Sequence, residues 1–396
     1  MQSGNANPFV AIACGGTGGH LFPGLAVAEE LRGRGCEVAL LISPKEVDQQ
    51  AAKSAVGLEV VTLPAVALTR GRALDFARGF LASFRAARRL FRERPPRAVL
   101  GMGGFTSAPP ILAGKLRGAA TAFHESNAIP GRANRWLAHV VDEAFVGFAG
   151  ATGHLFMQRI TTTGTPVRAQ FQPQDAAACR AALGLNPRRP VLLVMGGSQG
   201  AAGINDLVIA ALPALARLMP DLQFLHLSGN GELDKVRAAY DALHLSAVVR
   251  PFLAEMAQGL GAATAAVSRA GASTLTELAA MRLPAILIPY PHSAYDHQLC
   301  NARAFARSGA ARLVEQQDAT PHVISQSVVE LTNHPDVRAG IAAALAPWHQ
   351  PQAAAQIAAR LLRAMGFPEV VSNPDRGGRV APTTPSVLRH PQVVLP

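Results

Sequence analysis

Three glycine-rich turns have the clearest chemical potential in this sequence, because each follows a short apolar run that predicts a β-strand. They read GGTGGH at 15–20, GMGGF at 101–105 and GGSQG at 196–200. Glycine at a strand-to-helix turn lets a phosphate approach backbone N–H groups, and the positive end of the following helix adds to the attraction. One such turn is weak evidence, since a tight turn needs glycine anyway. Three, spread over both halves, predict a site for a phosphorylated ligand.

A nicotinamide dinucleotide is not the expected ligand. The dinucleotide fingerprint requires G-x-G-x-x-G and an acidic residue about 20 residues later, at the tip of the second strand. The turn GGTGGH lacks that spacing, and the second predicted strand ends in LISPK, without an acid.

Two histidines and a glutamate are candidates for proton transfer. His20 closes the first glycine turn, and its unperturbed pKa near 6.5 suits a general base. His124 and Glu125 end another predicted strand. For each histidine, a structural role is as well supported by the sequence as proton transfer. That role is a cap or phosphate contact for His20 and a structural hydrogen bond for His124.

The second half carries two further polar segments. In SRAGASTLTELAAM (268–281), Thr274 and Glu277 fit a capping box, with Thr274 as the N-cap. Glu277 could equally bind a ribose diol, and the residue types alone leave both roles open. The segment PYPHSAYDHQLCNA follows another predicted strand and is expected to contact the ligand through a polar cluster, namely His292, Asp296, His297 and Gln298.

The elements that must position these residues alternate between strands and helices, which predicts βαβ units on parallel sheets. The predicted strands of the first half are 9–14, 37–42, 59–62, 97–101, 121–124 and 143–147, and those of the second half are 190–195, 222–228, 247–250, 265–268 and 285–289. The segment 161–170 is the expected linker, because Gly-Thr-Pro breaks both periods. The stretch 336–366 predicts helix interrupted near Pro347 and Pro351, and a proline-rich disordered tail is expected from Phe367.

Composition limits the class of protein. The chain of 396 residues is long enough for two domains, and its net charge of +11 favours an anionic partner. No apolar run reaches the ~18 residues of a membrane span. A lipoprotein signal ending at Cys14 is disfavoured, because no Lys or Arg precedes it. The cysteines, which show no metal-like spacing and fit a reducing cytoplasm, are Cys14, Cys36, Cys179 and Cys300.

Seven segments in order resemble the MurG family of glycosyltransferases. They are GGTGGHLFPGLAVAEEL, GMGGFTSAP, HESNAIPGRANRWLA, GTPVR, GGSQGAAGIN, SRAGASTLTELA and PYPHSAYDHQLCNA, and the likeness covers roughly residues 9–366. It implies an α/β fold of the GT-B type, in which two Rossmann-like, doubly wound parallel-sheet domains face a cleft. Residues 1–165 would form an acceptor- and membrane-binding domain, with helices 345–366 packing back on it. Residues 166–344 would bind UDP-GlcNAc, and 367–396 would be a tail.

The resemblance also implies an activity. Such an enzyme is an inverting hexosyltransferase that moves GlcNAc from UDP-GlcNAc to the 4-hydroxyl of MurNAc in undecaprenyl-pyrophosphoryl-MurNAc-pentapeptide (lipid I), giving lipid II. It needs no cofactor and no metal, and no D-x-D motif is present. The implied general base is His20, with His124 and Glu125 as rivals. The implied donor contacts are Thr17, Gly18, Gly19, Asn127, Arg168, Ser198, Gln199, Gly200, Leu253, Ala272, Ser273, Thr274, Leu275, Thr276, Glu277 and Gln298.

Within that resemblance Glu277 becomes the ribose ligand, and Leu253 lies by the uracil through its backbone. The departures from the family pattern are small. Phe105 stands where a Tyr is common, and Ser126 replaces a Gln. The spacing of the loop near 298 varies in the family, so His297 remains an alternative to Gln298.

A basic segment at 70–97 has two interpretations. Leu74, Ala77, Leu81 and Phe84 recur at helical spacing among many arginines, with Phe80 and Phe91 beside them. The helix could pack on the sheet with a solvated arginine face, or press on anionic lipid with its Phe side chains buried there. The resemblance favours the second, at the cytoplasmic face of the inner membrane, with cell-wall synthesis proteins as further candidate partners. No nucleic-acid partner is expected, since no binding motif is present and aromatics are scarce.

Two rival functions use the same nucleotide contacts. A UDP-GlcNAc 2-epimerase would consume UDP-GlcNAc without an acceptor, and a non-catalytic membrane-bound sensor would tolerate loss of His20, His124 and Glu125. The GMGGF and HESN segments on the acceptor side favour transfer over both.

Overall fold

The computed structural model describes residues 7–16, 18–65, 73–197 and 200–367. Predictions made for Thr17, Ser198 and Gln199, and for the tail beyond Phe367, therefore lie outside the described residues. Phe367 itself, predicted to begin the tail, packs against the first core.

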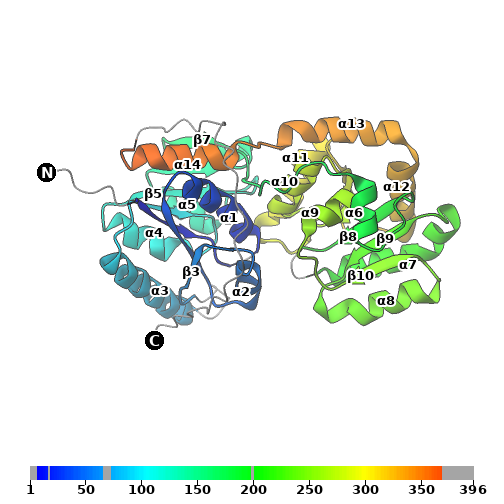
Figure 1. Cartoon of the computed structure of the whole chain (residues 1–396), viewed down its shortest axis with the longest axis horizontal. Helices are drawn as coiled ribbons and strands as arrows, with labels where there is room; N and C mark the ends of the chain where they lie inside the picture. Colours follow the sequence, from blue (N-terminus) through cyan, green and yellow to red (C-terminus); the bar gives the residue numbers. More distant parts are fainter. Residues whose placement is uncertain (1–6, 17, 66–72, 198–199, 368–396) are drawn as a thin grey trace, which may run out of the picture.

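Two parallel sheets, one in each half of the chain, organise the fold (Figure 1). The first sheet has the order β3-β2-β1-β4-β5-β6-β7. Its strands are β1 (Phe9–Ala13), β2 (Glu37–Ile42), β3 (Glu59–Thr62), β4 (Ala98–Gly101), β5 (Ala120–Glu125), β6 (Glu143–Val146) and β7 (Ile160–Thr162). The second sheet has the order β10-β9-β8-β11-β12-β13. Its strands are β8 (Val191–Met195), β9 (Gln223–Leu227), β10 (Ala247–Arg250), β11 (Ala265–Ser268), β12 (Ala285–Leu287) and β13 (Arg312–Leu313).

The predicted strands are confirmed to within one or two residues at each end, and two further strands were missed. The first of these, β7, takes the beginning of the predicted linker 161–170, which is wrong for its first residues. The central strands β1, β4 and β8 are apolar throughout because helices cover both faces of each sheet. All five residues of β1, for example, are buried.

Helices lie on both faces of each sheet. In the first half, α1 and α14 share one core with the sheet, whereas α3 and α4 share another on the opposite face. In the second half α7 packs on α12, and α9 packs on α6 and α10. The helices are α1 (Gly18–Gly33), α2 (Glu46–Ala52), α3 (Ala73–Glu93), α4 (Ala108–Lys115), α5 (Arg132–Leu137), α6 (Ala176–Ala182), α7 (Ala202–Leu218), α8 (Leu233–Ala242), α9 (Met256–Ala262), α10 (Ala272–Met281), α11 (His297–Arg307), α12 (Pro321–Asn333), α13 (Pro335–Leu345) and α14 (Ala353–Ala364).

The last helix returns to the first half. Figure 1 shows α14 lying against the N-terminal sheet while α13 lies over the other half. Ile357 and Leu361 are buried in the same core as α1. Arg360 forms an ion pair of 2.5 Å with Glu143 on β6. The chain between α13 and α14 is thus a second crossing between the halves, in addition to the one after β7.

Candidate active site

A cleft of about 2070 Å³ separates the carboxyl ends of the two sheets and is lined by residues from both. In each sheet the strand order reverses beside the central strand, between β1 and β4 and between β8 and β11. Doubly wound sheets bind ligands at this switch point. The three glycine turns follow β1, β4 and β8, so the fold brings all of them to the cleft.

His20 stands on the first turn of α1 and lines the cleft. Its ring packs on the backbone of the second glycine turn, because a Cβ on Gly103 would lie 2.9 Å from both Cε1 and Nδ1 of the ring. The Nδ1 atom is buried without a hydrogen-bond partner. Burial lowers the pKa of His20, opposed by the charge of Glu125 and by the Met102 carbonyl. A neutral imidazole at the cleft wall is the form that accepts a proton.

Glu125 also lines the cleft, and four N–H groups hold its carboxylate. Asn127 donates to Oε1 from its backbone at 2.9 Å and from Nδ2 at 3.0 Å. The backbone of Gly131 and Nδ2 of Asn134 each donate to Oε2 at 2.9 Å. With two donors on each oxygen, this carboxylate is held in one orientation at the wall, and its hydrogen-bonding positions are occupied.

His124 lies beneath the cleft wall and not in it. The residue is fully buried, its Nε2 lies 3.0 Å from the Gly164 carbonyl and its Nδ1 lies 3.2 Å from the Ser126 hydroxyl. Burial lowers its pKa to about 4. Both ring nitrogens are occupied, which favours the structural hydrogen bond over proton transfer for this histidine.

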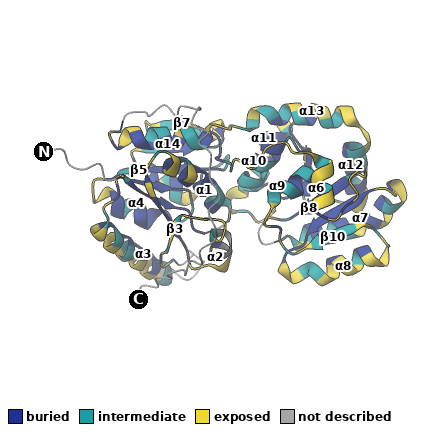
Figure 2. Cartoon of the chain, in the orientation of Figure 1, coloured by how far each residue is buried: buried dark blue, intermediate teal, exposed yellow. Residues whose placement is uncertain are grey.

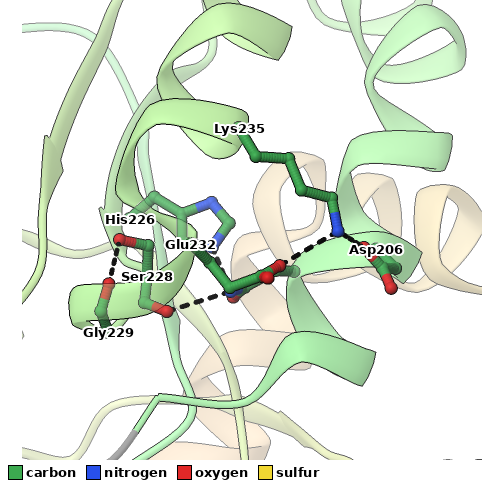
Figure 3. A network of polar contacts seen from close by, with 7 residues as sticks. Asp206, His226, Ser228, Gly229, Glu232 and Lys235 are labelled. Atoms are coloured by element: carbon green, nitrogen blue, oxygen red, sulfur yellow. Dashed lines mark hydrogen bonds and ion pairs between the residues drawn. The ribbon is translucent and has the colours of Figure 1, made fainter.

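In the second half, a buried network supports the turn after β8 (Figure 3). Gly200 has a φ of +73° and no room for a side chain, since a Cβ would lie 2.6 Å from the Ser228 carbonyl oxygen. Asn205 on α7 donates to that oxygen at 2.9 Å and binds Nε2 of His226 at 3.0 Å. Burial lowers the pKa of His226 to about 4, so the ring stays neutral inside the sheet. At the surface beside this network, Lys235 pairs with Asp206 and Glu232.

Helix α10 points its N-terminus into the same cleft. The helix begins at Ala272 with Gly271 as its N-cap, and no side chain caps it. The predicted capping box with Thr274 as the N-cap is therefore wrong, because Thr274 stands inside the first turn. Ser273 donates to the Gly19 carbonyl of the other half at 2.9 Å. Of the implied contacts at 272–277, Ala272, Ser273 and Thr274 are thus gathered at a helix end that attracts phosphate.

Glu277 faces the cleft one turn into α10. Burial raises its pKa to about 7, and the positive charge of Arg168 opposes that rise. Arg168 itself lies between two rings, 4.6 Å from the centroid of Phe22 and 5.2 Å from that of Phe171. A carboxylate beside an arginine and a helix N-terminus suits a sugar hydroxyl pair and a diphosphate in one ligand.

We expect affinity for the implied ligand, UDP-GlcNAc, to depend on pH through Glu277. If the ribose binds the carboxylate, the raised pKa means that protonation competes with the ligand below pH 7. Affinity should then fall about tenfold per pH unit below 7 and level off above it. Calorimetric titrations from pH 5.5 to 8.5 check this. The Glu277→Gln variant should bind weakly with little pH dependence, and an unchanged slope in that variant would place the titrating group elsewhere.

Most of the remaining predicted residues line the cleft, including Gly200, Ala272, Ser273 and Thr274. The predictions for Leu275 and Thr276 are wrong, because Leu275 is buried in the second core and the Thr276 hydroxyl donates to the Ala272 carbonyl of its own helix. Gly19, Asn127 and Leu253 also line the cleft. Gln298 and His297 both line it as well, so the alternative between them stays open. Gln298 accepts a hydrogen bond from the Tyr290 backbone at 2.9 Å, and His297 lies 2.6 Å from the Ala294 carbonyl. Among the described residues, no group of three His, Cys, Asp or Glu side chains could hold a metal ion.

Sequence reasoning missed two asparagines. Asn134 on α5 donates to Glu125, and Asn301 on α11 is buried between the two halves. The sequence did contain a sign of both residues. Each places an amide side chain at a helix position that the helical period assigns to the buried face. An amide there costs free energy unless it is hydrogen-bonded, so it marks a specific partner.

Known families match both halves of the chain. The model described as the glycosyltransferase family 28 N-terminal domain matches residues 10–146, and that of the C-terminal domain matches residues 191–360.

Individual relatives agree over nearly the full length. The chain is 40% identical, over 81% of its length and 89% of the relative's, to the UDP-N-acetylglucosamine–N-acetylmuramyl-(pentapeptide) pyrophosphoryl-undecaprenol N-acetylglucosamine transferase of Verminephrobacter eiseniae. It is 36% identical to the transferase of the same name from an Anaeromyxobacter species, over 88% of the chain and 91% of that relative.

Among solved structures, Acinetobacter baumannii MurG superposes with a TM-score of 0.70 at 26% identity, covering 90% of this chain and all of that one. The Neisseria meningitidis UDP-GlcNAc 2-epimerase superposes with a TM-score of 0.67 at 15% identity over 90% of this chain and all of that one, which shows a shared fold alone. The two-domain architecture, the family 28 matches and the 35–40% identity to curated relatives agree: the chain belongs to glycosyltransferase family 28 and, within it, to the MurG family.

Proposed function

We propose that this chain transfers N-acetylglucosamine from UDP-GlcNAc to the 4-hydroxyl of MurNAc in undecaprenyl-pyrophosphoryl-MurNAc-pentapeptide, forming lipid II. The relatives that match most of the chain are named for this transfer. The single observation that carries the proposal onto this chain is the cleft itself. It places a phosphate-attracting helix N-terminus with Glu277 opposite a wall that holds His20 and Glu125.

The proposed mechanism is an in-line displacement with inversion. The acceptor oxygen attacks the anomeric carbon as the bond from that carbon to the diphosphate oxygen breaks. The hydroxyl proton passes to His20, and the electron pair of the broken bond leaves with UDP. Backbone N–H groups at the start of α10 and the guanidinium of Arg168 stabilise the charge that grows on the diphosphate. Removing one such preorganised donor typically costs about 10²–10³ in rate.

The two halves have separate roles in this proposal. Residues 1–165, with α14 returned to them, hold the acceptor and the membrane-facing surface. The predicted return from residue 345 is wrong for its start, since Leu345 and Trp348 pack in the core of the second half. Residues 166–344 hold UDP-GlcNAc, through Glu277, Gln298 and the Gly200 turn. The negative charge of Glu125 faces the anomeric carbon region from the acceptor side, where positive charge develops in an oxocarbenium-like transition state.

The test is UDP release from UDP-GlcNAc with and without a soluble lipid I analogue. Release that requires the analogue and gives a disaccharide supports the proposal. Release or sugar isomerisation without the analogue would favour an epimerase, and tight UDP-GlcNAc binding without turnover would favour a sensor.

We also propose that α3 docks the protein on anionic membrane at the cytoplasmic face. No helix among the described residues is both long and apolar enough to cross a bilayer. The prediction that Phe side chains of this helix enter the lipid is wrong for Phe91, which is fully buried in the core, while Phe80 and Phe84 pack against that core. The exposed apolar side chains are instead Leu74 and Leu81, with 75% and 44% of their surface exposed. Figure 2 shows the outward side of α3 largely exposed, and exposed arginines share this side of the helix at Arg78, Arg85, Arg88, Arg89 and Arg92.

Replacing both exposed leucines should weaken membrane binding. The double variant Leu74→Ser, Leu81→Ser is expected to bind vesicles of phosphatidylglycerol and phosphatidylethanolamine at least tenfold more weakly, since each buried CH₂ contributes about 0.8 kcal/mol. Wild-type binding should also fall as salt screens the arginines. Sedimentation with vesicles measures both effects. Leu218→Ser, which changes a 50%-exposed leucine on α7 in the other half, is the matched control and should bind like wild type. Equal loss in the control would refute a specific role for α3.

A further inference from the structure

Asn301 on α11 joins the two halves of the molecule at a buried contact between them. The residue is fully buried. Its Nδ2 donates to Oδ1 of Asn127 at 3.1 Å and to the Ala270 carbonyl at 3.2 Å. Its Oδ1 accepts the backbone N–H of Ala128 at 2.8 Å. Asn127 and Ala128 belong to the first half, whereas Ala270 belongs to the second, so one side chain bonds to both.

The direction of each of these hydrogen bonds is determined by the groups involved. A backbone N–H can only donate, so the Asn301 atom facing Ala128 must be the oxygen. The nitrogen then faces the Ala270 carbonyl, which can only accept. Because that nitrogen also donates toward Asn127, Asn127 must present its own oxygen to Asn301. Its nitrogen is consequently directed away, toward the carboxylate of Glu125 at 3.0 Å.

This ordered chain of bonds connects the donor turn to the acceptor wall. Ala270 precedes Gly271, the N-cap of α10, which carries Ser273 and Glu277. Asn127 supplies two of the four N–H groups that hold Glu125. The position of the α10 turn is therefore linked through Asn301 to the side chain of Asn127 and to one oxygen of Glu125.

We propose that Asn301 is a positioning residue, which orients Asn127 and thereby Glu125 for transfer when the two halves are closed on each other. The inference rests on the proposed transfer activity. It gives Asn301, a residue of the second half, a role at the acceptor wall of the first half. When the halves separate, the bonds to Asn127 and Ala128 break. Asn127 is then free to turn, and Glu125 loses one fixed donor. Closure thus completes the acceptor wall.

The test is a double-mutant cycle between Asn301→Ala and Asn127→Ala, measured with UDP-GlcNAc and a soluble lipid I analogue. Wild-type turnover must first be established, because its absence would remove the proposed function and not this inference. We expect Asn301→Ala to lower kcat about 10- to 100-fold, as a small misplacement of a reacting group does. Asn301→Ala should divide its effect between kcat and KM in the same proportion as Asn127→Ala does. The double variant should be no slower than the slower single variant, because both changes disrupt one linkage.

Three measurements separate this role from a general packing role. Calorimetric stoichiometry for UDP-GlcNAc shows whether the second half is folded. If Asn301→Ala fails that check, Asn301→Ser retains a hydroxyl near Ala270 but is too short to reach Asn127, and it replaces Ala in the cycle. Asn333→Ala alters an exposed asparagine at the end of α12 and should match wild type throughout. Rate losses that multiply in the double variant, or a kcat for Asn301→Ala within threefold of wild type, would overturn the proposal.

Discussion

The His20→Ala variant should lose about 10²–10⁴-fold in turnover, while its affinity for UDP-GlcNAc stays within about threefold of wild type. General-base catalysis contributes this much to proton transfer. Of the three predicted proton acceptors, His20 has a ring that lines the cleft, and no side chain of a described residue holds its buried Nδ1. Glu125 carries four donors, and both nitrogens of His124 are occupied. Single-turnover rates with a lipid I analogue, together with calorimetry, measure the two quantities.

The pH dependence gives a second check on His20. Burial lowers its pKa, so the neutral, proton-accepting form persists to a pH below the usual 6.5. The acid limb of kcat, measured with saturating UDP-GlcNAc so that the titration of Glu277 does not enter, should therefore fall below pH 6.5 and disappear in His20→Ala. His322→Ala removes an exposed histidine at the start of α12 and should leave both the rate and the profile unchanged. Near-normal turnover in His20→Ala would dismiss the assignment and leave Glu125→Gln as the next variant to examine.

Most of the sheet could be predicted because its strands are buried on both faces. Runs such as 9–13 and 37–42 are apolar over nearly their whole length, and the glycine turns mark where they end. The short strands β7 and β13 escaped because three and two residues carry no periodicity. Their existence depends on a neighbouring strand that presents free hydrogen-bonding groups, which is information from the fold and not from the segment.

The sequence predicted where the cleft residues lie along the fold, but not what each side chain can do there. A residue's position after a strand end follows from the sequence, so His20, Glu125 and Glu277 were each predicted at a strand-to-helix turn, and all three line the cleft. What each can do depends on partners brought from elsewhere. The four donors on Glu125 include a side chain nine residues away, and the cap of α10 proved to be Gly271 and not Thr274. Asn301 lies 174 residues from Asn127, and no local pattern links them.

Gly103→Ala should reduce turnover about 100-fold without touching a substrate-binding side chain. A Cβ at this position would lie 2.9 Å from Cε1 and Nδ1 of His20, so the imidazole must move. Displacing a catalytic group by about 1 Å costs on the order of 10² in rate. The backbone adds strain, since φ is +108° at Gly103 and a non-glycine residue is disfavoured at positive φ by about 1–3 kcal/mol.

Gly118→Ala is the control that distinguishes the effect of displacing the His20 ring from the effect of backbone strain. Gly118 also has a positive φ, +75°, but nothing lies within 4 Å of its would-be Cβ. This variant should lose stability to a similar degree, seen as a lower melting temperature, and keep its turnover. Turnover and thermal unfolding of the two variants, measured side by side, check the prediction. Equal turnover in both would mean that the contact between the second glycine turn and His20 does not set the position of the imidazole during catalysis.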